Sequence, residues 1–262
     1  MDFAENNIMT FMWPNDFIEL DVRNRPKLKW QSYQVDQDFF WHRHNNTLPA
    51  DILCSKTLLD LGCYLGATGH WALEHGCSHY TGVELIEQHL QHAKDLLSKY
   101  HHVDKFSLIQ TEISKFLTTC QQHYDIVVAW GILNSFVDPI PVIQNLLRIS
   151  DRVLIDSPIP QSIKDMKDHD NQRALIELNP MSCQMQITDH NPVTFQGSRI
   201  SMRAIEMIGE QSGFRSDRVP YSTLSQVLPS VYGPSSASGR IMTVLIRDSD
   251  LVAPKTYQDI YG

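Results

Sequence analysis

The chain has 262 residues, of which 42% are hydrophobic, and this suits one large α/β domain with additions. It carries 22 basic residues against 30 acidic ones, and the formal net charge of −8 argues against a protein that binds duplex DNA or tRNA. Its 5 cysteines form no C-x-x-C pair and fit neither a disulfide framework nor a zinc site. Because no signal peptide and no membrane-spanning run is visible, we expect a cytoplasmic chain with reduced thiols and no membrane attachment.

Residues 1–50 are rich in aromatic side chains, and prolines break them into pieces. A short helix is possible from Asp36 onward, and the basic run at 23–30 is either a local patch or a solvated connector. We expect residues 1–50 to form a cap over the main domain, which spans 51–250 and is followed by a tail at 251–262.

From residue 57 onward, short apolar runs alternate with amphipathic segments. The runs predict five strands, and the segments between them predict four helices. A later helix ends at Gly213, and two further strands follow it. Residues 157–200 interrupt this rhythm with a polar, mixed insert. The expected strands are 57–61, 79–85, 105–110, 124–130, 152–157, 215–222 and 240–248, and the expected helices are 66–76, 86–100, 112–122, 138–150 and 200–214.

Such alternation is typical of right-handed βαβ units and therefore of a parallel sheet. The two late strands are joined by a loop and suggest an antiparallel hairpin at one sheet edge. The sequence thus predicts a doubly wound, Rossmann-like α/β fold with a mostly parallel seven-stranded sheet and helices on both faces.

A glycine-rich turn follows the first expected strand, with glycines at Gly62, Gly66 and Gly69. In an open parallel sheet, ligands bind beyond the carboxyl ends of the strands, and glycine lets the backbone approach them. Glu84 ends the second strand, where a carboxylate can accept hydrogen bonds from a ribose diol; the alternative is an ordinary surface glutamate. A dinucleotide would favour G-x-G-x-x-G, which this turn lacks, so a dehydrogenase is disfavoured.

The stretch "LLDLGCYLGATG" (58–69) resembles the first motif of class I S-adenosylmethionine-dependent methyltransferases, D-x-G-x-G-x-G. Asp60, Gly62 and Gly66 match the motif, whereas Tyr64 replaces its middle glycine. The stretches "YTGVEL" (80–85), "LIQTEISKF" (108–116) and "YDIVVAWGILNSFVDP" (124–139) resemble the second, third and fourth motifs.

This resemblance implies S-adenosylmethionine as cofactor and S-adenosylhomocysteine as product. It implies that Asp60 positions the methionine ammonium, although an acid there could also simply cap the turn. The glycine turn would hold the amino-acid end of the cofactor, and Glu84 would bind its ribose. Leu85, Glu112 and Ile113 would border the adenine, and Trp130 would lie near the reacting centre. The cofactor-binding residues so implied are Asp60, Gly62, Cys63, Gly66, Glu84, Leu85, Glu112, Ile113 and Trp130.

The implied reaction is direct in-line displacement of the methyl group, which requires alignment and exclusion of water more than acid–base chemistry. We expect an O or N atom of a small molecule as acceptor. The stretch 130–158 resembles the subgroup that acts on small metabolites and on the wobble uridine of tRNA, so a tRNA substrate is the alternative. A non-catalytic subunit that only binds the cofactor is a further alternative.

The acceptor pocket is expected between residues 1–50 and the insert. Candidate catalytic residues are Tyr33, His42 and His44 in the first segment and His190 in the second, and a histidine among them could act as a general base because histidine titrates near neutrality. The alternative for each, an ordinary packed or surface side chain, is favoured. The histidines and the aspartate of the insert lack the tight spacing of metal ligands, so no metal is expected.

Overall fold

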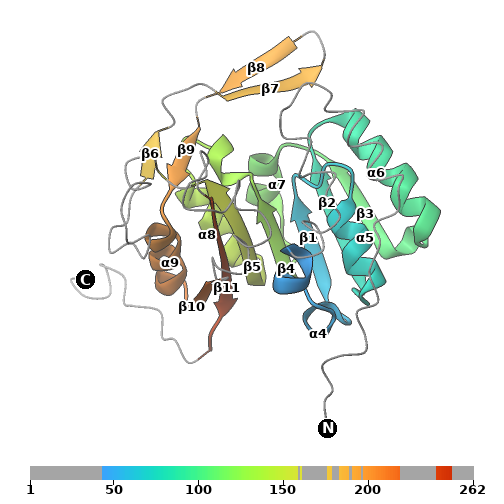
Figure 1. Ribbon diagram of the computed structural model, residues 1–262, viewed down its shortest axis with the longest axis horizontal. Coiled ribbons are helices and arrows are strands. Elements are labelled where there is room, and N and C mark those ends of the chain that lie inside the picture. The colour runs from blue at the N-terminus through green and yellow to red at the C-terminus, as the bar shows by residue number, and fades with distance from the viewer. Residues whose placement is uncertain are drawn as a thin grey trace.

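A seven-stranded sheet runs through the centre of the molecule, in the order β10-β11-β5-β4-β1-β2-β3 (Figure 1). The computed structural model describes residues 43–158, 160, 176–178, 183–188, 191–195, 197–218 and 240–249. Five strands are parallel, and β11 lies antiparallel to both of its neighbours, so the predicted mostly parallel sheet with an antiparallel edge hairpin is confirmed. The strands are β1 Thr57–Leu61, β2 His79–Glu84, β3 Phe106–Gln110, β4 Tyr124–Trp130, β5 Ser150–Pro158, β10 Phe214–Arg218 and β11 Arg240–Arg247.

Helices cover both faces of this sheet and divide the apolar interior into two cores. One core packs the sheet against α4, α5 and α6, and the other packs it against α7, α8 and α9. Because both faces are covered, the central strands are apolar nearly throughout and do not alternate with polar residues. The helices are α4 Ala50–Leu53, α5 Ala67–Glu74, α6 Glu87–Tyr100, α7 Ile113–Thr119, α8 Ile140–Arg148 and α9 Met202–Gln211, with short 3-10 helices η1 Val103–Lys105 and η2 Leu133–Ser135.

The insert contains strands that the sequence analysis did not predict. β6 Ile176–Leu178 pairs with β9 Ser198–Ile200, and β7 Cys183–Thr188 pairs with β8 Asn191–Phe195. Figure 1 places the β7–β8 hairpin apart from the central sheet. The mixed, polar composition of the insert concealed these strands, although Ile200 of β9 reaches a core and apolar residues alternate with polar ones along β7.

The part of the chain that the structure describes contains no helix that is long and apolar enough to cross a membrane.

Gly69 makes room for a buried tyrosine next to the glycine turn. A Cβ atom at Gly69 would lie 2.5 Å from Cε1 of Tyr80, whose ring is fully buried. We expect Gly69→Ala to lower the free energy of unfolding by about 1–3 kcal/mol, because an added methyl group overpacks the site. Denaturant unfolding checks this. In an unobstructed helix the same change stabilises by about 1 kcal/mol, so a gain in stability would contradict the prediction.

Candidate active site

The turn between β1 and α5 has an unusual backbone. Gly62, Tyr64 and Gly66 all have positive φ, at 74°, 51° and 76°. The N–H groups of Gly62 and Cys63 both donate to the carbonyl of Val83, at 2.8 and 3.0 Å. The turn is therefore fastened to the end of β2, and its left-handed residues bend the chain sharply at the carboxyl edge of the sheet.

Glu84, the last residue of β2, holds this turn through its carboxylate. Oε2 accepts from the backbone N–H of Tyr64 at 3.1 Å, while Oε1 accepts from the N–H groups of Leu85 and Ile86, both at 2.9 Å. A carboxylate offers about four acceptor sites, so one on Oε2 is left for a ligand. Burial raises the pKa of Glu84, but the nearby His89 and the backbone donors outweigh it and hold the pKa below its usual range. Glu84 is thus an ionised anchor of the turn.

Asp60, in β1 and two residues before Gly62, is buried on the face of the sheet that α5 covers. It accepts a hydrogen bond from the hydroxyl of Tyr80 at 3.0 Å. Burial raises the pKa of Asp60 to about 7, against the opposing effects of Tyr80 and the Arg43 guanidinium. The carboxyl group is therefore half ionised near neutrality, and a cationic group beside it would favour its charged form.

The remaining expected cofactor residues lie along the same edge. The side chain of Cys63 is buried against β2, because a Cβ atom at Gly82 would lie 2.8 Å from its Sγ, so only its backbone belongs to the turn. Leu85 is exposed, Glu112 is exposed at the start of α7, and Ile113 is half-buried against the core. The N–H of Thr111 donates to the carbonyl of Glu84 at 3.1 Å, so the ends of β2 and β3 are tied together.

Trp130, at the end of β4, forms the other side of the site. It pairs in register with Asp156 of β5. The Arg43 guanidinium lies over its ring, 4.1 Å from the centroid, and the His44 ring meets it edge-on at 4.8 Å. Both come from the helical segment 43–47, which therefore contacts the carboxyl edge of the sheet.

His44, an expected candidate base, is fully buried. Its ring lies 5.4 Å from that of Trp71, and its Nε2 lies 3.4 Å from Oγ1 of Thr68. The His44 ring therefore packs between Trp71 of α5 and Trp130 of β4. Tyr33, His42 and His190 lie outside the described residues.

The sequence analysis did not find Tyr80 or Arg43. Tyr80 could have been found from strand periodicity, because it and Asp60 point to the same face of neighbouring strands. Arg43 had only a weak signal, a basic residue within the aromatic stretch "FFWHRH".

Comparison with known proteins points to one family. Residues 59–150 match the profile of the family described as "Methyltransferase domain". No curated protein matches the chain. Many solved structures share the fold, and three of them, each only distantly related in sequence, illustrate the similarity. A methyltransferase from Mesorhizobium loti that depends on S-adenosylmethionine has a TM-score of 0.55 and 14% identity, over 80% of this chain and 98% of that one.

The other two structures contain S-adenosylhomocysteine. Magnesium protoporphyrin IX methyltransferase from Synechocystis PCC 6803 has a TM-score of 0.52 and 12% identity, over 88% of this chain and 94% of that one. The N-terminal domain of EvdMO1 has a TM-score of 0.56 and 14% identity, over 80% of this chain and 81% of that one. Residues 59–150 therefore resemble a methyltransferase domain, within a chain whose fold also occurs in S-adenosylmethionine-dependent methyltransferases.

Proposed function

We propose that this chain binds S-adenosylmethionine at the turn between β1 and α5 and transfers its methyl group, by in-line displacement, to an O or N atom of a small molecule. The observation that carries the proposal is the left-handed turn fastened by the Glu84 carboxylate, at 3.1 Å from the N–H of Tyr64. The match to the methyltransferase family and the S-adenosylhomocysteine bound in two proteins of the same fold support it.

The residues of the site fit this cofactor. Asp60 would face the methionine ammonium, because its buried carboxyl group gains most from a cationic partner. Glu84 would use its remaining acceptor site for a ribose hydroxyl, and Leu85, Glu112 and Ile113 would border the adenine. When bound, S-adenosylmethionine supplies a methyl group on a positively charged sulfur that leaves as a neutral thioether.

Two polar atoms at and after the end of β4 favour a polar acceptor. Nε1 of Trp130 and Oδ1 of Asn134, in η2, are buried and have no hydrogen-bond partner in the described part of the chain. A buried polar group without a partner costs about 1–3 kcal/mol, and an acceptor molecule with both a donor and an acceptor group would remove this cost. The net charge of −8 favours a small molecule over tRNA.

Binding measurements test the proposal first. We expect S-adenosylmethionine and S-adenosylhomocysteine to bind with micromolar affinity in calorimetry, whereas NAD and NADP do not bind. Small polar acceptors should then be screened with radiolabelled S-adenosylmethionine, in parallel with tRNA. Failure of both sulfur compounds to bind would overturn the proposal, and methylation of tRNA alone would overturn the small-molecule part.

Trp130→Phe tests the acceptor side separately. Phenylalanine keeps an aromatic ring under Arg43 and His44 but removes the indole N–H. We expect kcat/KM for the acceptor to fall about tenfold, because one hydrogen bond of about 1.5 kcal/mol is lost, while affinity for S-adenosylmethionine stays unchanged. Equal losses in both quantities would instead place the indole N–H against the cofactor.

A further inference from the structure

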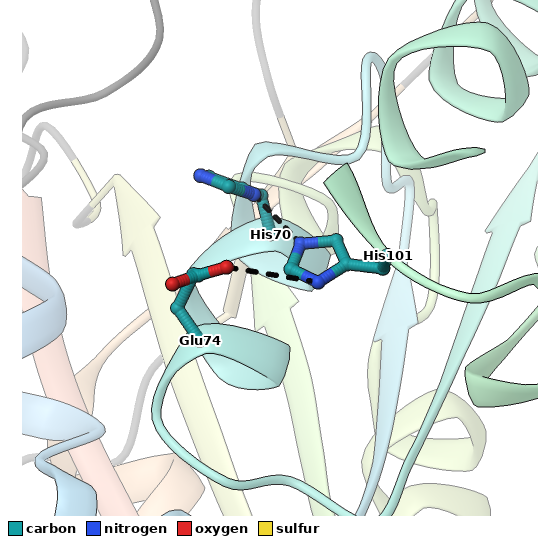
Figure 2. Close-up of side chains that lie close together, drawn as sticks. All are labelled: His70, Glu74 and His101. Carbon is teal, nitrogen blue, oxygen red and sulfur yellow. Dashed lines mark hydrogen bonds and ion pairs between the residues drawn. The ribbon is translucent and has the colours of Figure 1, made fainter. Parts of the chain in front are cut away.

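A cluster of two histidines and one glutamate lies outside the residues assigned to methyl transfer. Figure 2 shows His70 and Glu74, from α5, pointing toward the imidazole of His101, which follows α6. Nδ1 of His70 lies 2.7 Å from Nε2 of His101, and Oε1 of Glu74 lies 3.8 Å from Nδ1 of His101. One ligand atom from each residue can be chosen so that all three lie within 4.8 Å of one another.

Local structure brings these side chains together. His70 and Glu74 are four residues apart on α5, so they share one face of the helix. His101 is held at the end of α6 because its N–H donates to the carbonyl of Leu97 at 2.8 Å. The side chains of His70 and His101 are buried and that of Glu74 is 47% exposed, so the cluster combines two fixed imidazoles with one movable carboxylate.

We propose that His70, Glu74 and His101 bind a divalent transition-metal ion of the zinc class. Two imidazole nitrogens and one carboxylate oxygen are a ligand set that Zn²⁺ takes in proteins, with a fourth position left to water. Mg²⁺ and Ca²⁺ prefer sites made of oxygen ligands, and this cluster offers oxygen from only one side chain.

The geometry needs only small adjustments to accept the ion. Zinc–nitrogen bonds of about 2.0–2.1 Å in a tetrahedral site place ligand atoms roughly 3.3 Å apart. The two rings would separate by about half an ångström, and the exposed Glu74 side chain would turn inward. The short contact between the rings requires one of the two facing nitrogens to carry a lone pair, and the other to carry a proton. If that proton moves to the outer nitrogen of the same ring, both facing nitrogens have a lone pair for the ion.

A bound ion would join two helices that flank β2. α5 begins directly after the glycine turn, and His101 marks the end of α6. Metal binding at this cluster would therefore fasten the first helix after the turn to its neighbour and stabilise the folded chain.

Metal titration of the full chain, stripped with a chelator and without S-adenosylmethionine, tests the site independently of methyl transfer. We expect one Zn²⁺ to bind per chain in calorimetry and to raise the melting temperature. Co²⁺ should give the visible absorption of a four-coordinate ion without a sulfur charge-transfer band, which separates this cluster from the free cysteines Cys54, Cys63, Cys77 and Cys120.

Variants assign the binding to the cluster. Glu74→Gln leaves the core intact because its side chain is half-exposed, and we expect Zn²⁺ affinity to fall about tenfold; His101→Asn should lower it by about a hundredfold. His102→Asn is the matched control, because His102 is the next residue but its exposed ring pairs with Asp104, at 2.6 Å. Unchanged Zn²⁺ affinity in both cluster variants, or an equal loss in His102→Asn, would overturn the proposal.

Discussion

Replacing Glu84 with glutamine is expected to weaken S-adenosylmethionine binding by about a hundredfold or more and to lower the free energy of unfolding by about 2–4 kcal/mol. The change removes the charge that three backbone N–H groups share. If the amide oxygen of the glutamine still accepts from the N–H groups of Leu85 and Ile86, its N–H₂ group points toward the N–H of Tyr64. Two donors then face each other. The turn then loses the hydrogen bond that ties Tyr64 to β2, at the point where the cofactor would lie.

Calorimetry and denaturant unfolding of the same samples measure the two effects. Glu87→Gln is the matched control, because Glu87 is exposed in the first turn of α6. If stability falls while cofactor affinity stays at the level of the control, Glu84 organises the turn without contacting the ligand. An unchanged stability would mean that its three hydrogen bonds contribute nothing to the fold.

Asp60→Asn is expected to stabilise the free protein at pH 8 and to weaken S-adenosylmethionine binding. The pKa of Asp60 is raised from 3.8 to about 7 by burial, so the folded state binds a proton more tightly than the unfolded state. The contribution of this group to stability is therefore complete below pH 4 and is lost as the pH rises toward 7. The difference between the two pKa values corresponds to at most about 4 kcal/mol of the free energy of unfolding. Asparagine does not ionise and therefore avoids this loss.

Unfolding curves between pH 4 and pH 8 test the sign. We expect the stability of the wild-type chain relative to Asp60→Asn to decline over this range, and cofactor affinity of the wild-type chain to rise as Asp60 ionises. Asp125→Asn is an informative control with the opposite sign. Although partial burial raises its pKa, the Thr57 and Lys56 hydrogen bonds outweigh burial and lower it, so this variant should be less stable than wild type near neutral pH. Parallel pH profiles for wild type and Asp60→Asn would show that Asp60 does not titrate in this range.

Most of the central sheet was predictable because its strands are short apolar runs that end in glycine or acidic residues. β1, β2 and β4 are buried on both faces, and that burial forces the composition that reveals them. β7 and β8 were not predictable in this way. They pair with each other apart from the central sheet, and β7 carries an alternation of Cys183, Met185 and Ile187 with polar residues instead of a continuous apolar run.

The site residues that end strands could be predicted from the sequence. Contacts between side chains of different segments could not. Glu84 and Trp130 occupy positions that follow directly from strand ends. The contact of Tyr80 with Asp60 depends on the register of β1 against β2, and that of Arg43 with Trp130 joins segments 87 residues apart in sequence. His44 had the right residue type for a base, but only packing against Trp71 and Trp130 reveals that its ring is enclosed.

The position of β11 has a consequence for the order in which the sheet is built. Although its residues come after every other strand of the central sheet, β11 lies between β5 and β10 and not at an edge. β10 pairs with β11 alone, and β5 keeps one row of backbone groups unpaired until residues 240–247 have been synthesised. A nascent chain therefore presents an open strand edge on β5 while residues 159–247 are being synthesised, when it is most exposed to aggregation and to binding by chaperones.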